Sequence, residues 1–187
     1  MKFLKPKSQE EYIQVQEERH TSLVHEYPIS PWHEDLFTKF NQHLKAPIID
    51  IGTRNGKILD VLEEKGFESW GVELTDIAKW AQFNRRKVIQ CDIHERTLFP
   101  DKFFKTAIMT HALEHCYDME KVLKEINRIL EGHFYLVTLT GGSIEQAHYI
   151  NFENIEEIVE LLENNGFKVD DYYSTGNAYN YIFANNL

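Results

Sequence analysis

The stretch Ile48-Ile49-Asp50-Ile51-Gly52-Thr53-Arg54-Asn55-Gly56 decides the fold, because an apolar run meets a carboxylate and then two glycines. The apolar residues 47–51 are typical of a buried parallel strand, and the glycines let the backbone approach a ligand closely. Residues 57–65 then carry apolar side chains at helical spacing. We therefore predict a strand, a ligand-binding turn and a helix, with a nucleotide-like molecule as the ligand.

Two classes of nucleotide-binding turn fit this outline, and the glycines separate them. The dinucleotide fingerprint G-x-G-x-x-G needs glycines at positions 54 and 57, where the chain has Arg54 and Lys57. A strand-end acid followed by Gly52 and Gly56 instead resembles the first motif of class I S-adenosylmethionine (SAM)-dependent methyltransferases, with Arg54 in place of the middle glycine. The resemblance implies SAM as the cofactor, bound at Asp50, Gly52, Thr53, Arg54, Asn55 and Gly56.

Two further acids follow predicted strands. Residues 69–74 indicate a second strand ending at Glu73, where a carboxylate can accept both hydrogen bonds of a ribose diol. Residues 87–93 indicate a third strand closing on Asp92, which in the resembling family lies by the adenine amino group. Taken singly, such acids are more often solvated, but acids at the carboxyl ends of successive parallel strands point into one crevice. The predicted cofactor contacts here are Glu73, Leu74, Asp92 and Ile93.

Residues 105–115 are the most family-specific stretch of the chain. They look like the fourth strand of the resembling family and its H-x-L-E-H continuation, from His111 to His115. By this resemblance Thr110 and His111 lie at the cofactor. His111 stands nearest the crevice and is our candidate catalytic base. Packing against the cofactor is an equally open role, because many such enzymes need only proximity and orientation.

The same residues spell H-x-x-E-H, which is also an inverted zinc-protease motif. That site needs both histidines on one helix face, a further acidic ligand downstream and a quite different fold. Because the motif directly follows a predicted buried strand, we predict no metal site.

The remaining pattern completes an α/β fold. Helices are predicted at residues 118–130 and 154–165, and further strands at 132–140, 167–173 and 180–184. With the resemblance, this gives a seven-stranded, mostly parallel Rossmann-like methyltransferase sheet with helices on both faces and an antiparallel last strand. The length of 187 residues fits one domain, with a helical extension at residues 1–44 and the core at 45–187.

The helical extension is predicted to cover the cofactor crevice. Ser8 and Glu11 form a capping box for a first helix, and Ser30-Pro31 opens a second one with apolar residues at helical spacing. In the resembling family such an extension often forms part of the acceptor pocket. Aromatic residues near a helix junction are also common in ordinary packing, so both explanations stay open. The residues concerned are His20, His25, Tyr27, Trp32 and His33.

Composition excludes several classes of protein. A formal net charge of -10 disfavours general nucleic-acid binding, because the protein repels phosphate backbones. We find no apolar core for a signal peptide in the first residues and no apolar run of membrane-spanning length, so we expect a cytoplasmic protein without a membrane partner. Cys91 and Cys116 are too few for a disulfide framework and are predicted to be free thiols.

The predicted activity is methyl transfer to a small-molecule acceptor, by O-, N- or C-methylation. The fourth strand lacks the [DN]-P-P-[YF] sequence that resembles enzymes methylating adenine or glutamine, and no Pro-Cys pair suggests cytosine methylation. Segment 141–149 with Tyr172, Tyr173, Asn177 and Tyr179 is predicted to line the acceptor pocket. One alternative is a non-catalytic SAM-binding or partner-binding module that keeps the fold, suggested by Arg54 and by the shortened turn at Glu131-Gly132. Another is a nucleotide-binding oxidoreductase, which needs the missing glycines.

Overall fold

The computed structural model describes residues 1–20, 29, 31–141, 147–175 and 178–187. The strands of its main sheet are β2 (Ile48–Ile51), β3 (Ser69–Glu73), β4 (Val88–Gln90), β5 (Phe104–Thr110), β6 (Leu130–Leu139), β8 (Phe167–Ser174) and β9 (Tyr179–Asn186). The helices between them are α3 (Lys57–Glu64), α4 (Ile77–Phe83), α5 (Met119–Ile129) and α6 (Ile155–Asn164).

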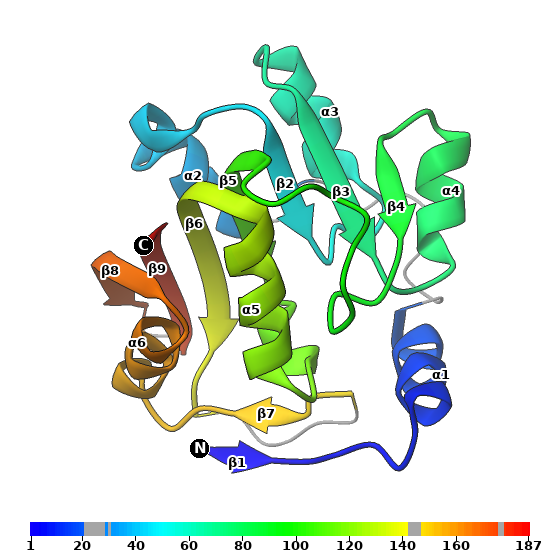
Figure 1. The fold of residues 1–187 in the computed structure, drawn as a ribbon, viewed down its shortest axis with the longest axis vertical. Helices are drawn as coiled ribbons and strands as arrows, with labels where there is room; N and C mark the ends of the chain where they lie inside the picture. The colour runs from blue at the N-terminus through cyan, green and yellow to red at the C-terminus, as the bar shows by residue number, and fades with distance from the viewer. Residues whose placement is uncertain (21–28, 30, 142–146, 176–177) are drawn as a thin grey trace.

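The seven strands lie in the order β4-β3-β2-β5-β6-β9-β8 (Figure 1). Neighbours from β4 to β6 are parallel, whereas β9 is antiparallel to both β6 and β8. The predicted seven-stranded, mostly parallel α/β fold is therefore confirmed, including its antiparallel last strand. The third predicted strand ends earlier than expected, at Gln90, because Asp92 begins a turn and accepts the backbone N–H of His94 at 3.0 Å.

The amino-terminal region is helical, but its second helix is divided. The first helix, α1 (Gln9–His20), begins after Ser8, whose hydroxyl accepts the backbone N–H of Glu11 at 3.1 Å as expected of a cap. The prediction of one continuous second helix is wrong. The region consists of three short helical elements, η2 (Pro31–His33), α2 (Glu34–Thr38) and η3 (Asn41–His43). Its apolar side chains are nevertheless buried, because the short helical pieces still direct Leu36, Phe40 and Leu44 into the core.

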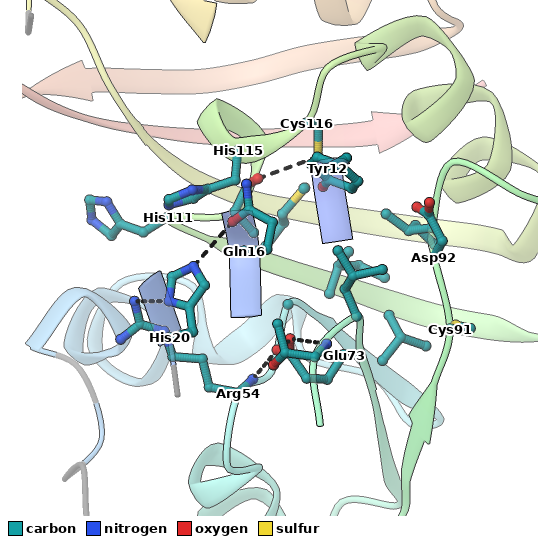
Figure 2. Close-up of a pocket in the computed structure, with 18 residues that line it drawn as sticks. Tyr12, Gln16, His20, Arg54, Glu73, Cys91, Asp92, His111, His115 and Cys116 are labelled. Atoms are coloured by element: carbon teal, nitrogen blue, oxygen red, sulfur yellow. Dashed lines mark hydrogen bonds between the residues drawn. The ribbon is translucent and has the colours of Figure 1, made fainter. Parts of the chain in front are cut away.

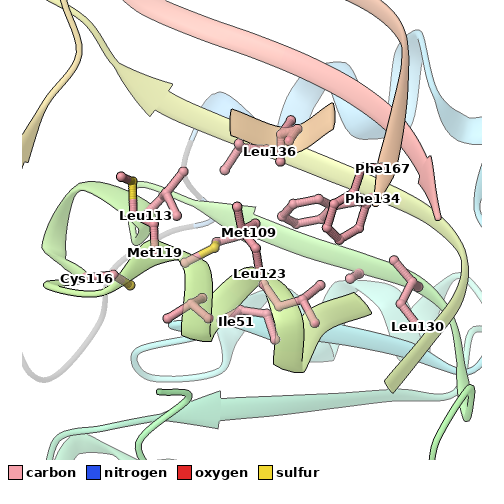
Figure 3. Packing of buried hydrophobic residues seen from close by; sticks show 14 of the residues in the cluster. Ile51, Met109, Leu113, Cys116, Met119, Leu123, Leu130, Phe134, Leu136 and Phe167 are labelled. Carbon is pink, nitrogen blue, oxygen red and sulfur yellow. The ribbon is translucent and has the colours of Figure 1, made fainter. Parts of the chain in front are cut away.

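Side chains of the central strands alternate between two hydrophobic layers. Ile48 and Ile108 pack in the layer that contains the apolar faces of α2, α3 and α4. Ile49 and Met109, one position further along each strand, pack in the layer that contains α5 and α6 (Figure 3). Helices thus cover both faces of the sheet, as predicted, and the strands are rigidly held between them.

The carboxyl ends of the parallel strands point towards α1 and a small second sheet (Figure 1). That sheet pairs β1 (Lys2–Phe3) with β7 (Ile150–Asn151) in antiparallel fashion, and sequence analysis did not predict it. It ties the start of the chain to the segment that follows β6. The helices of the described residues are all too short or too polar to cross a membrane.

Candidate functional site

Two adjoining cavities lie at the carboxyl ends of the parallel strands. The first lies between α1, the ends of β2, β3 and β5, and the segment after β4 (Figure 2). The second is larger and extends from the turn after β2 to η2 and Tyr179. Gly52, Arg54 and His111 line both cavities, so the two spaces meet beside these residues.

The turn after β2 has three residues with left-handed backbone conformation. Gly52 and Gly56 have φ of 73° and 69°, which glycine adopts without strain. A side chain at Gly52 would also place its Cβ 2.7 Å from the Cβ of Ala112, so glycine is required for the close approach to the segment after β5. Arg54 has φ of 52°, so this arginine holds the conformation that suits a glycine, at a cost of about 1–2 kcal/mol.

Glu73 at the end of β3 connects this turn to the next one. It is 7% exposed. One carboxylate oxygen accepts the backbone N–H of Arg54 at 2.8 Å, and the other accepts the backbone N–H and the hydroxyl of Thr75 at 3.0 and 2.8 Å. The carboxylate therefore braces the turn, and its Oε2 retains acceptor capacity towards the first cavity.

Asp50 lies in the middle of β2 and is 3% exposed. Its Oδ1 is buried and has no hydrogen-bond partner among the described residues. Burial raises the pKa of Asp50 to about 7, opposed by the neighbouring Thr53 hydroxyl and assisted by the nearby charge of Glu73. Asp50 also lines the second cavity. A cationic group of a ligand bound there can pair with its carboxylate and offset the cost of burying that charge.

Asp92 closes the far end of the first cavity. Its Oδ1 lies 2.6 Å from Nδ1 of His94, and Gln9 of α1 donates to its Oδ2 at 3.0 Å. Although burial opposes ionisation, these hydrogen bonds hold the pKa of Asp92 below its usual range. Asp92 is thus an ionised acceptor that also anchors α1 over the cavity.

The partly buried His111 and the buried Glu114 form a pair at the boundary of the two cavities. Nδ1 of His111 lies 3.1 Å from Oε1 of Glu114, and the hydroxyl of Thr138 donates to Oε2 at 2.9 Å. Although burial opposes ionisation, the contact with His111 holds the pKa of Glu114 at about 2. A carboxylate accepts only, so Nδ1 of His111 is the donor, and in the neutral ring Nε2 is the acceptor. This Nε2 is buried and has no hydrogen-bond partner among the described residues.

Helix α1 contributes residues that sequence reasoning did not assign to the cofactor site. Tyr12, Gln16 and His20 are spaced by four and line the first cavity together (Figure 2). Gln16 donates to the carbonyl of Ala147 at 3.2 Å, and its Oε1 lies 3.3 Å from Nε2 of His20. Burial lowers the pKa of His20 to about 3, so this imidazole is neutral. The regular spacing of Tyr12, Gln16 and His20 was the available signal.

The comparison with protein families identifies the chain. Residues 19–172 match the family model described as a methyltransferase domain. This chain belongs to the methyltransferase family. Its cofactor is SAM, as the glycine turn predicted. No curated protein matches the chain significantly.

Solved structures share the fold of this methyltransferase at low sequence identity. The 1,6-didemethyltoxoflavin-N1-methyltransferase of Burkholderia thailandensis, solved with 1,6-didemethyltoxoflavin and S-adenosylhomocysteine, has a TM-score of 0.76 at 20% identity, covering 98% of this chain and 92% of that one. A SAM-dependent methyltransferase from Aquifex aeolicus has a TM-score of 0.68 at 14% identity, covering 91% and 98%. The [4+2]-cyclase SpnF has a TM-score of 0.69 at 13% identity, covering 95% and 94%.

The methyltransferase brings nearly all of the predicted cofactor residues to the cavities. Gly56 does not line either one; it precedes α3 and packs beside Val88 and Arg86. The first cavity is lined by Glu73, Leu74, Asp92 and Ile93, the second by Asp50, Thr53, Asn55 and Thr110, and both by Gly52, Arg54 and His111.

The predicted acceptor residues are divided between the second cavity and other places. Tyr172 is exposed, and Tyr173 bonds instead to Asp35 of α2. His25, Tyr27, Asn177 and residues 142–146 lie outside the described residues. Those that line the second cavity are His20, Trp32, His33, His148 and Tyr179.

Two substitutions at Arg54 test the strained turn. Both Arg54→Gly and Arg54→Ala remove the guanidinium group, but only alanine keeps a Cβ in the left-handed conformation. We expect the glycine variant to be more stable than the alanine variant by about 1 kcal/mol. Urea unfolding of the two variants measures the difference, and equal stabilities would show that the turn is unstrained.

Asp50 gives a pH dependence that can be isolated with Asp50→Asn. Because its pKa is raised from 3.8 to about 7, the folded protein binds more protons than the unfolded chain between these values. The contribution of Asp50 to stability is therefore lost as pH rises through this window. We expect the free energy of unfolding of the wild type, minus that of the variant, to fall from pH 4.5 to 7.5. The histidines are present in both proteins and cancel, so a constant difference would contradict the assignment.

Proposed function

We propose that this protein transfers the methyl group of SAM to a small-molecule acceptor held in the second cavity. The observation that carries the proposal is the unpartnered Nε2 of His111. It lies where the two cavities meet, with its tautomer set by Glu114. A buried acceptor atom at such a boundary is placed to receive a proton from a second molecule.

The first cavity suits the adenosine part of the cofactor. Glu73 retains acceptor capacity for a ribose hydroxyl, and Asp92 supplies an acceptor near the far end, where an exocyclic amine can donate. Asp50 offers its unpartnered oxygen to the ammonium group of the methionine part, on the side of the second cavity. These residues fit SAM by charge and by hydrogen-bonding capacity.

Bound SAM supplies an electrophilic methyl group on a sulfonium, so the protein needs to align, desolvate and deprotonate the acceptor. Helix α1 covers the first cavity through Tyr12 and Gln16, which excludes water from it. His111 takes the acceptor proton on Nε2 while Glu114 stabilises the resulting imidazolium. Proximity and orientation supply the remaining part of the rate enhancement.

A small acceptor is favoured by the aromatic wall of the second cavity. The ring of Trp32 lies 3.9 Å from that of His111 and 5.2 Å from that of Tyr179, measured between centroids. Such a wall suits a planar or apolar molecule of limited size. The Burkholderia thailandensis enzyme of similar fold is named as an N1-methyltransferase of 1,6-didemethyltoxoflavin, which agrees with this proposal.

A second function is a binding module that keeps the fold without methyl transfer. The strained Arg54 favours it, because its side chain lines both cavities where a glycine would leave space. The cyclase SpnF, of similar fold, is named for a different reaction. A non-catalytic module can still bind SAM and S-adenosylhomocysteine in a calorimetric titration. Measurement of turnover therefore separates the two functions.

Titration with S-adenosylhomocysteine tests the cofactor site through Glu73→Gln. Glutamine keeps the shape but removes the charge and half of the acceptor capacity. We expect the affinity of the variant to be lower by about 1.5–3 kcal/mol, or roughly tenfold to a hundredfold. Asp76→Asn at an exposed helix start provides a matched control that should bind as the wild type does. Unchanged affinity in Glu73→Gln would exclude its role at the ribose.

His111→Gln tests the proposed base. With hydroxylated and acidic-carbon metabolites screened as acceptors, we expect formation of S-adenosylhomocysteine to fall by about 10²–10⁴-fold, because glutamine cannot take the proton. Binding of S-adenosylhomocysteine should change little. A variant that loses binding and turnover together would instead assign His111 to the lining of the cofactor site.

A further inference from the structure

Glu114, His115 and His148 come together at the edge of the second cavity. One ligand atom from each lies within 4.8 Å of the others. The rings of His115 and His148 meet edge to face, with centroids 4.6 Å apart. We propose that these three residues bind a divalent transition-metal ion, for which two imidazoles and one carboxylate are a preferred donor set.

The hydrogen bonds of His115 and Glu114 leave each of them an atom that can bind a metal ion. Nδ1 of His115 lies 2.9 Å from the carbonyl oxygen of Ala147. Because a carbonyl oxygen only accepts, Nδ1 carries the proton and Nε2 keeps its lone pair. Glu114 is oriented by His111 on one oxygen and Thr138 on the other, with acceptor capacity left on each. Contacts of this kind, from residues outside the ligand set, are the usual means of fixing metal ligands in proteins.

This ligand set differs from the one considered for the sequence motif. The H-x-x-E-H pattern pairs His111 with His115 on a helix, whereas the structure places the motif in a turn, η4 (Leu113–His115). There His111 bonds to Glu114 and His148 takes its place beside His115. His20 also lies beside His115, but its Nδ1 faces Arg54 at 3.5 Å and its Nε2 faces Gln16.

Three protein ligands leave coordination positions open, as in catalytic rather than structural metal sites. All three residues line the second cavity, so the open positions face the space assigned to the acceptor. An acceptor with a hydroxyl or carboxylate oxygen can bind the ion there and be held near His111. This last step rests on the proposed function, whereas metal binding does not.

Zinc titration of the chelator-treated full-length protein, in competition with a coloured zinc indicator, tests the site. We expect one equivalent to bind per chain and excess Mg²⁺ not to displace it, because Mg²⁺ prefers oxygen ligands. His148→Ala should weaken zinc binding by about a hundredfold. Loss of a residue that only orients a metal ligand costs up to this much, and loss of a ligand should cost at least as much. His148 is partly exposed, and circular dichroism checks that the variant folds. His43→Ala, an imidazole packed against Phe183 elsewhere, should bind zinc as the wild type does.

The outcomes separate the metal site from the proposed function. If the wild type binds S-adenosylhomocysteine but no zinc, the proposed metal site is wrong and the proposed function stands. Equal zinc affinity in the His148→Ala and His43→Ala variants would likewise contradict the metal site alone. Stoichiometric zinc binding without S-adenosylhomocysteine binding supports the metal site and contradicts the methyl-transfer proposal. With Co²⁺ as the ion, acetohydroxamate should change the visible spectrum by binding at the open positions; an unchanged spectrum overturns the open coordination.

Discussion

The buried carboxylate of Glu73 is the interaction on which the shape of the cofactor cavity depends. It accepts hydrogen bonds from the turn after β2, through Arg54, and from the turn after β3, through Thr75. Arg54 adopts a backbone conformation that disfavours any residue with a side chain, and such a conformation persists only when its surroundings determine it. The hydrogen bond from its N–H to Glu73 is one of those determinants. Glu73 therefore has a structural role in both turns.

A second carboxyl group, that of Asp50, lies on the neighbouring strand β2 but is less well supplied with hydrogen-bond donors than Glu73. Glu73 has three donors, whereas one oxygen of Asp50 has no partner among the described residues. Burial beside another acid favours the neutral form of Asp50, which is why its pKa rises to about 7. A cation at this place would restore the charged form, so the two acids together make the cavity complementary to a positively charged ligand.

Much of this arrangement was predictable because it depends on local rules. Strand alternation, the glycines at positive φ and the acids at strand ends all follow from short stretches of sequence, and they located β2, β3 and β5. The division of the second helix was not predictable, since Leu36, Phe40 and Leu44 have helical spacing whether or not the helix is continuous. The contact between His115 and His148 was also not predictable, because it depends on the path of the chain after β6.

Elements far along the chain from β2 and β3 decide what the second cavity can hold. Its aromatic wall comes from η2, which precedes the sheet in sequence, and from β9, the last strand of the sheet. They also constrain His111, which has φ of 52° although it is not glycine. Its N–H bonds to the carbonyl of Val137 at 2.8 Å, its Nδ1 contacts Glu114, and its ring packs against Trp32. Several contacts thus hold a strained residue with one ring nitrogen unpaired, and strain of this kind concentrates where a protein positions a reacting group. The fold accounts for the cofactor, and the contacts around His111 account for the position of its ring, whose Nε2 has no hydrogen-bond partner among the described residues.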